Sequence, residues 1–250
     1  MPMQANPGIN RLGREASRLS YAERNSPYWR RNLIVCVFGS FTTLVSLSML
    51  LPFLPLYVQQ LGATSSSAII QWSGVAFGAT FVGTAITAPL WGHLADRFGR
   101  KPMLVRAAIG MAVVMSLIGV AHTVVELVGL RLLAGLLGGY ASASIVMIGT
   151  QAPRERAGWA LGLLSTGALM GNLVGPLVGG FLPAWVGLRG TFFVCGAMIA
   201  VAAAATLLLV REDFDREADH PHQAAAQRQA ALASHRAVIV ALLFTAMMVL

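Results

Sequence analysis

Charged residues are scarce in this chain of 250 residues. Asp, Glu, Lys and Arg make up 11% of it and hydrophobic residues 56%, whereas an ordinary soluble domain carries roughly 25% charged residues. A soluble fold of this composition would have a core with almost no polar surface to cover it. The shortage of charge therefore excludes that class and indicates a membrane protein.

Cysteine is also rare, since the chain has only Cys36 and Cys195, and both lie inside apolar runs. Two isolated thiols in such surroundings argue against a disulfide framework and against a cysteine-based metal site. We expect both to be small buried side chains, and we expect neither a metal nor an organic cofactor.

Long apolar runs, by contrast, follow one another along the chain. A membrane-spanning helix needs about 20 mostly apolar residues, and a further run begins at Ala237 and reaches the last residue, Leu250. At 1.5 Å per residue this last run covers about 21 Å of a roughly 30 Å hydrocarbon core, so we expect the truncated start of a seventh helix. The six complete candidate spans are Leu33–Tyr57, Ala68–Trp91, Met103–His122, Val125–Ile148, Ala157–Pro183 and Thr191–Val210.

The few basic residues are distributed unevenly. Sixteen of the 18 Lys and Arg residues lie in the N-terminal tail and in every second connection between the spans. The positive-inside rule then puts the N-terminus in the cytoplasm and predicts an even number of passes up to residue 210. The first run is too long for a cleavable signal peptide. A basic tail beside such a run is explained by the membrane, so no nucleic-acid partner is expected.

These features predict a domain organisation. Residues 1–32 form a basic cytoplasmic tail, 33–210 a six-helix transmembrane domain, 211–236 a polar cytoplasmic linker, and 237–250 the start of the seventh helix. PLWGHLADRFGRK at 89–101 also resembles PLVGGFLPAWVGLRG at 176–190, each at the end of the second helix of a group of three. One would lie inside and the other outside, which is the pattern of a 3+3 inverted repeat.

The segment GHLADRFGRKP, residues 92–102 and here called the charged loop, places four charges between two apolar spans. The positive-inside rule explains its basic residues but not the acidic Asp96 among them. We interpret it as a salt-bridged latch at a helix end, with Gly92 allowing close approach. The alternative is a plain basic loop that only sets orientation.

A single arginine, Arg131, lies well inside an apolar span. Burying it costs roughly 2.5 kcal/mol or more on insertion scales, so it should face a cavity or a partner. Arg131, Gly135 and Gly139 would share one stripe of a continuous helix. The alternative is a side chain that snorkels to the outer surface.

The stretch GALMGNLVGPLVGG, residues 167–180, has a glycine at every fourth position, with Pro176 midway. Such a ridge lets two helices pack closely. This packing needs no transport role, so both interpretations stay open at this point.

Together these motifs resemble the major facilitator superfamily, and within it the drug:proton antiporter branch of bacterial multidrug efflux transporters. The resemblance runs from about residue 30 to 210 and includes LPFLPLYVQQLG at 51–62 and GWALGLLSTG at 158–167. It implies that the charged loop stabilises the outward-facing state, that Arg131 acts in proton transfer or its control, and that the fifth-helix glycines form the antiporter motif. The matching positions are Gly92, Asp96, Arg97, Gly99, Arg100 and Lys101 in the loop, and Gly171, Gly175, Pro176, Gly179 and Gly180 in the fifth helix.

One departure concerns the proton-carrying acid. Transporters of this kind often have a carboxylate within the membrane, but Leu33–Tyr57 contains none. The acid then belongs to a second half, or Glu126 serves, or coupling differs. Glu126 equally suits an exposed residue at a helix start.

The expected fold is therefore an all-α membrane protein, the N-terminal six-helix half of a major facilitator, in the bacterial cytoplasmic membrane. The expected function is export of a small lipophilic substrate by alternating access, with the proton gradient as energy source and the missing C-terminal half as partner. The alternatives are a half-length protein without transport activity and, less favoured because no histidine or aspartate lies mid-span, an intramembrane enzyme. Candidates for lining the cavity are Phe41, Trp72, Phe81, Met147, Met170 and Asn172.

Overall fold

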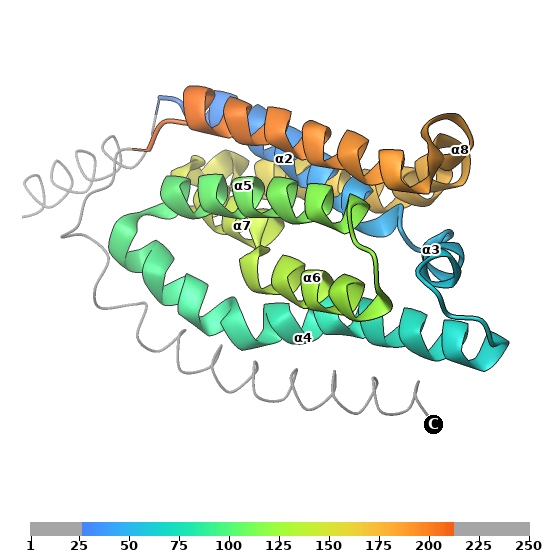
Figure 1. Cartoon of the computed structure of the whole chain (residues 1–250). Coiled ribbons are helices and arrows are strands. Elements are labelled where there is room, and N and C mark those ends of the chain that lie inside the picture. The colour runs from blue at the N-terminus through green and yellow to red at the C-terminus, as the bar shows by residue number, and fades with distance from the viewer. Residues whose placement is uncertain (1–26, 213–250) are drawn as a thin grey trace, which may run out of the picture.

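The described part of the chain, residues 27–212 of a computed structural model, is built from helices, with no strand among those residues. The predicted basic tail up to residue 26, most of the predicted linker (213–236) and the predicted seventh helix from Ala237 lie outside the described residues. Figure 1 shows the helices as a bundle in which α2, α5 and α8 run side by side, with α4 and α6 along one flank. The helices are α2 (Trp29–Ser48), α3 (Leu54–Gln60), α4 (Ser66–Phe98), α5 (Arg100–Gly119), α6 (Val124–Leu137), α7 (Tyr140–Gln151) and α8 (Arg154–Leu209).

Five of these helical segments are long and apolar enough to cross a bilayer. The last of them, α8, has 56 residues, which at 1.5 Å per residue is about 84 Å and more than twice the roughly 30 Å of a hydrocarbon core. Its backbone leaves the helical region at Gly187, where φ is 76°. The chain turns back there, as Figure 1 shows at the right-hand end of α8, so the described residues make six passes, and each of the six predicted spans is mostly helical.

The ends of the helices differ from the predicted spans in three places. The first span stops at Ser48, because Pro52 and Pro55 cannot continue the helical hydrogen bonding, and restarts as the short α3. The fourth span is divided into α6 and α7 at Gly138–Gly139. The turn predicted over the charged loop is reduced to Gly99, since α4 runs to Phe98 and α5 starts at Arg100.

Helix pairs pack through glycines, and the pairing has a symmetry. The first pass lies against the fifth, where Gly171 faces the Phe41 carbonyl, and the second lies against the fourth, where Gly83 faces the Leu132 carbonyl. The third lies against the sixth, where Gly196 faces Ser116. If the first, second and third passes are exchanged with the fourth, fifth and sixth, the same three pairs result. This symmetry agrees with the predicted inverted repeat.

The apolar core lies mainly between α2, α3, α5, α7 and α8, with contributions from α4 and α6. Tyr57 packs against Phe192, with ring centroids 4.9 Å apart, and donates a hydrogen bond to the Ile118 carbonyl. Cys36 and Cys195 are buried free thiols, as predicted. Because α2, α5 and α8 share this core, they fix the positions of the helix ends that carry the charged loop.

Candidate functional site

The charged loop is ordered by contacts within itself. Gly99 adopts φ 95°, a backbone conformation that favours glycine, and this lets α5 start directly after α4. Arg100 donates to the Asp96 carboxylate at 3.0 Å, an ion pair one helical turn apart in sequence. The salt bridge predicted for this segment is therefore present. Arg97 is exposed and lies over the Phe98 ring, whereas Gly92 has open space beside it among the described residues.

Glu212 provides a second set of contacts to the charged loop. Its carboxylate accepts hydrogen bonds from the backbone N–H of Arg100 at 2.7 Å and of Lys101 at 2.6 Å. These N–H groups belong to the first turn of α5, where no partner within the helix is available and where the helix dipole favours an anion. Glu212 was predicted to belong to the linker, but in the structure it ties the end of α8 to the start of α5.

Asn32 on α2 holds the same end of α8 from the other side. Its side-chain amide donates to Gln151 Oε1 at 2.7 Å and to the Arg211 carbonyl at 2.6 Å, and its Oδ1 accepts from the Arg211 N–H at 3.1 Å. Gln151 is the last residue of α7. The ends of α2, α5, α7 and α8 are thus joined by Asn32 and Glu212, neither of which the sequence motifs singled out.

Arg131 is buried inside the bundle, with 1% of its surface exposed. None of its three guanidinium nitrogens has a hydrogen-bond partner among the described residues. The snorkelling alternative does not fit this burial. The stripe expected to link it with Gly135 and Gly139 stops at Gly135, because α6 ends at Leu137 and Gly139 is not in that helix.

Glu126 lies at the other end of α6 and is exposed. It accepts from the His122 N–H at 2.7 Å, while the Thr123 hydroxyl accepts from the Glu126 N–H at 3.2 Å. This arrangement resembles a capping box, except that the carboxylate accepts from the N–H of the residue before the N-cap, Thr123. The local geometry of Glu126 therefore matches the second of the two predicted roles, an exposed residue at a helix start.

The glycines of the fifth pass face α2. A Cβ at Gly171, Gly175 or Gly179 would run into the backbone of α2, at the Phe41, Val45 and Met49 carbonyls respectively. Gly180 is different, because a Cβ there would meet nothing within 4 Å. Pro176 lies inside α8 among these contacts. Three glycines of the motif thus allow close packing on α2, whereas the fourth has no neighbour in the described part that would clash with a side chain.

The residues predicted to line a cavity are spread over different surroundings. Trp72, Phe81, Met170 and Asn172 are exposed and Phe41 is half-buried. Met147 is fully buried in the apolar core, so in this structure it packs the bundle instead of facing open space.

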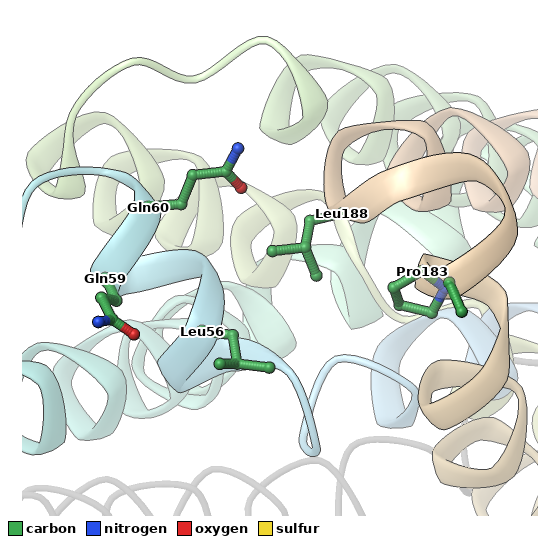
Figure 2. Close-up of a pocket in the computed structure, with 6 residues that line it drawn as sticks. Leu56, Gln59, Gln60, Pro183 and Leu188 are labelled. Atoms are coloured by element: carbon green, nitrogen blue, oxygen red, sulfur yellow. The ribbon is translucent and has the colours of Figure 1, made fainter.

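Two pockets lie near the ends of the helices, at the end of the bundle remote from the charged loop. The larger, about 550 Å³, lies between α3 and α8, and Figure 2 shows Leu56, Gln60 and Leu188 turned toward it. The smaller, about 350 Å³, lies between α5 and α6 and includes Glu126. Neither is lined by the predicted cavity residues.

Comparison with known proteins decides the family. A model of the Major Facilitator Superfamily matches residues 36–250, which is most of the chain. The chain belongs to the major facilitator superfamily. It is therefore a multi-pass member of a transporter family, which excludes the enzyme alternative.

Among curated members of the superfamily, the chain is 51% identical over 186 residues to the multidrug resistance protein MdtG of Klebsiella pneumoniae strain 342, covering 74% of this chain and 45% of that protein. It is 48% identical over 197 residues to MdtG of Escherichia coli O1:K1, covering 78% and 48%. The chain spans about half the length of these relatives.

Solved major facilitator structures share the fold. The POT family transporter PepTSo superposes with a TM-score of 0.67 at 18% identity, over 78% of this chain and 41% of that one. A D-xylose-proton symporter superposes with a TM-score of 0.62 at 20% identity, over 82% and 53%. At these identities the likeness shows the arrangement of helices alone.

Proposed function

We propose that this chain is the N-terminal half of a proton-coupled exporter of small lipophilic compounds that works by alternating access in the bacterial cytoplasmic membrane. The observation that carries the proposal is the 48–51% identity to multidrug resistance proteins across the helical part of the chain. The charged loop and the glycine ridge of α8 lie within the residues that the family model matches. Their structures suit a lobe that moves as a unit. By the positive-inside rule, the charged loop and the N-terminus face the cytoplasm.

A rocking mechanism needs a rigid lobe, and the contacts at the charged loop favour one. Asn32 and Glu212 join the ends of α2, α5, α7 and α8, so these helices move together. The outer face of the fifth pass has large exposed side chains that the described residues leave uncovered. A second lobe and lipid would cover them in the complete transporter. They are Leu169, Leu173, Leu177, Phe181 and Trp185.

Proton coupling needs a group that gains and loses a proton as the lobes move. The four acidic residues of the described part, Asp96, Glu126, Glu155 and Glu212, all lie at helix ends. Arg131 is buried in the span without a hydrogen-bond partner among the described residues, and a buried charge of this kind is stabilised by an opposite charge. In the proposed mechanism, Arg131 is uncovered as the lobes move, and a carboxylate of the second half then pairs with it and exchanges protons, while Glu126 caps its helix.

The experiment is transport by the complete protein in proteoliposomes, with a fluorescent lipophilic dye as the substrate. We expect dye movement when a pH gradient is imposed and its loss when an ionophore collapses the gradient. Arg131→Leu should abolish the response to the gradient and Glu126→Gln should keep it. Dye movement that is indifferent to the gradient would overturn proton coupling, and loss of coupling in Glu126→Gln alone would move the proton site to Glu126.

The two-lobe part of the proposal has its own control. Residues 1–250 reconstituted alone should move no dye, because the substrate path lies between two lobes. Transport by this chain alone at the rate of the complete protein would show that the second lobe is not required.

A further inference from the structure

The fourth pass is broken at Gly138 and Gly139. Gly138 has an extended backbone with ψ −166°, and Gly139 has φ 106°, which favours glycine over any other residue. The hydrogen bonds of a continuous helix are therefore interrupted here. Carbonyl groups at the end of α6 must find other partners, because water is scarce within a membrane.

Side chains from α4 and α5 supply those partners. Trp91 donates from Nε1 to the Leu136 carbonyl at 2.7 Å, and Arg106 donates from Nη2 to the Gly138 carbonyl at 3.2 Å. Thr87 adds a bond to the Leu136 carbonyl at 3.2 Å. The guanidinium carbon of Arg106 lies 3.4 Å from the centre of the Trp91 ring, so the two side chains stack and hold each other in place.

The other two nitrogens of the Arg106 guanidinium make no competing contact in the described part of the chain. Its Nε and Nη1 are buried and have no hydrogen-bond partner among the described residues. Its positive charge lies at the C-terminal end of α6, where the helix dipole favours a cation. Stacking, the bond to the Gly138 carbonyl and the dipole therefore all act on the same point, the break of the fourth pass.

The two parts of the fourth pass belong to different neighbours. α6 packs on α4 and α5, whereas α7 packs on α2, α5 and α8. Tyr140, the first residue of α7, bonds to the Thr206 hydroxyl at 2.7 Å and lies against Gly39 of α2. Figure 1 shows α6 beside α4 and α7 on the inner side of the bundle. The break is thus a joint between two groups of helices.

We propose that Trp91 and Arg106 are positioning residues that hold this joint bent and so link the charged loop to the segment that carries Arg131. Trp91 directly precedes the charged loop and Arg106 follows it by four residues, so a movement of the loop moves both. When they leave, the Gly138 carbonyl loses its side-chain donor and the Leu136 carbonyl keeps only the longer bond from Thr87, which favours a rearrangement of the fourth pass toward a continuous helix. The joint therefore has two discrete states, a requirement for a switch. This inference rests on the proposed function.

The test is a distance measurement across the joint in the complete transporter. Spin labels are placed at Val125 on α6 and Ile145 on α7, which are both exposed, after the two buried cysteines are replaced by alanine. A continuous helix would put these backbone positions about 30 Å apart. Trp91→Phe keeps the ring and removes the N–H donor, and Arg106→Lys keeps the charge and removes the planar stack.

We expect Trp91→Phe to raise the ratio of continuous to bent form about tenfold, the effect of losing one hydrogen bond of about 1.4 kcal/mol. Arg106→Lys should raise the same ratio through loss of the stack on Trp91. Trp185→Phe and Arg156→Lys, at exposed positions, should leave the distances unchanged. Gly139→Ala should shift them in the same direction as Trp91→Phe, because alanine disfavours the positive φ. A merely structural role would lower thermal stability without changing the distances of the folded protein.

Distances that stay at the wild-type values in Trp91→Phe, Arg106→Lys and Gly139→Ala would overturn the inference. The readout does not depend on transport. A wild-type protein that moves no dye under a pH gradient would contradict the proposed function, and the distances would still decide whether the joint exists.

Discussion

Asn32 and Arg211 are joined by two hydrogen bonds across 179 positions of the chain. The Asn32 amide donates to the Arg211 carbonyl at 2.6 Å, and its oxygen accepts from the Arg211 N–H at 3.1 Å. One side chain on α2 therefore satisfies both backbone groups of a residue two positions past the end of α8. The contact fixes where the bundle ends and the polar segment begins.

Asn32→Ala should destabilise the bundle by about 1–3 kcal/mol, because it leaves the Gln151 amide oxygen and the Arg211 backbone without partners. Asn32→Asp should be worse, since a carboxylate would face two carbonyl-type oxygens that now accept from the amide. Thermal unfolding can be followed with a thiol-reactive dye, because Cys36 and Cys195 are buried. Asn172→Ala, at an exposed asparagine, is the control, and an Asn32→Ala protein that unfolds at the wild-type temperature would contradict this prediction.

Glu212→Gln should loosen the charged loop. The carboxylate accepts two backbone N–H bonds, whereas an amide has one accepting oxygen and would turn its own N–H toward the other donor. We expect a loss of about 1–2 kcal/mol and faster trypsin cleavage after Arg97 and Arg100. Glu155→Gln, at an exposed first turn of α8, should change little, and equal cleavage rates in the two variants would refute the capping role.

The sequence predicted the spans well because each is set by a local quantity, the length of an apolar run. It did not reveal Asn32 or Glu212, whose partners lie 179 and about 110 residues away, since no local pattern records such a contact. The break at Gly138–Gly139 was also missed, because paired glycines in an apolar helix are usually a packing feature.

Gly175→Ala should destabilise the bundle while Gly180→Ala should not. At Gly175 a Cβ would meet the Ser48 hydroxyl and, at 2.8 Å, the Val45 carbonyl, so α8 must move away from α2. Overpacking of this kind costs about 1–3 kcal/mol. At Gly180 a Cβ has open space, and alanine gains up to about 1 kcal/mol of helix propensity. Thermal unfolding of the pair measures the difference, and equal unfolding temperatures would show that the ridge does not need glycine.

Arg131→Leu should separate stability from transport. In the described part the guanidinium is buried without a hydrogen-bond partner. Replacing a buried ion pair by apolar side chains of similar volume stabilises proteins by about 1–4 kcal/mol in favourable cases, and a charge without a counter-charge has no attraction to offset its burial. We therefore expect residues 1–250 carrying Arg131→Leu to unfold at a higher temperature than the unchanged chain. In the complete protein the same substitution should abolish transport driven by a pH gradient, because the proposed carboxylate of the second half loses its partner.

Arg131→Lys is the variant that tests this reasoning. It keeps the charge and the burial cost, so it should bring no stabilisation, and it should retain part of the gradient-driven transport. Arg189→Leu is the control for removing an arginine, since Arg189 is exposed and donates to the Ala121 carbonyl at 3.2 Å. If Arg131→Leu instead lowers the unfolding temperature of residues 1–250, the guanidinium has a stabilising partner within this chain, and the counter-charge need not come from the second half.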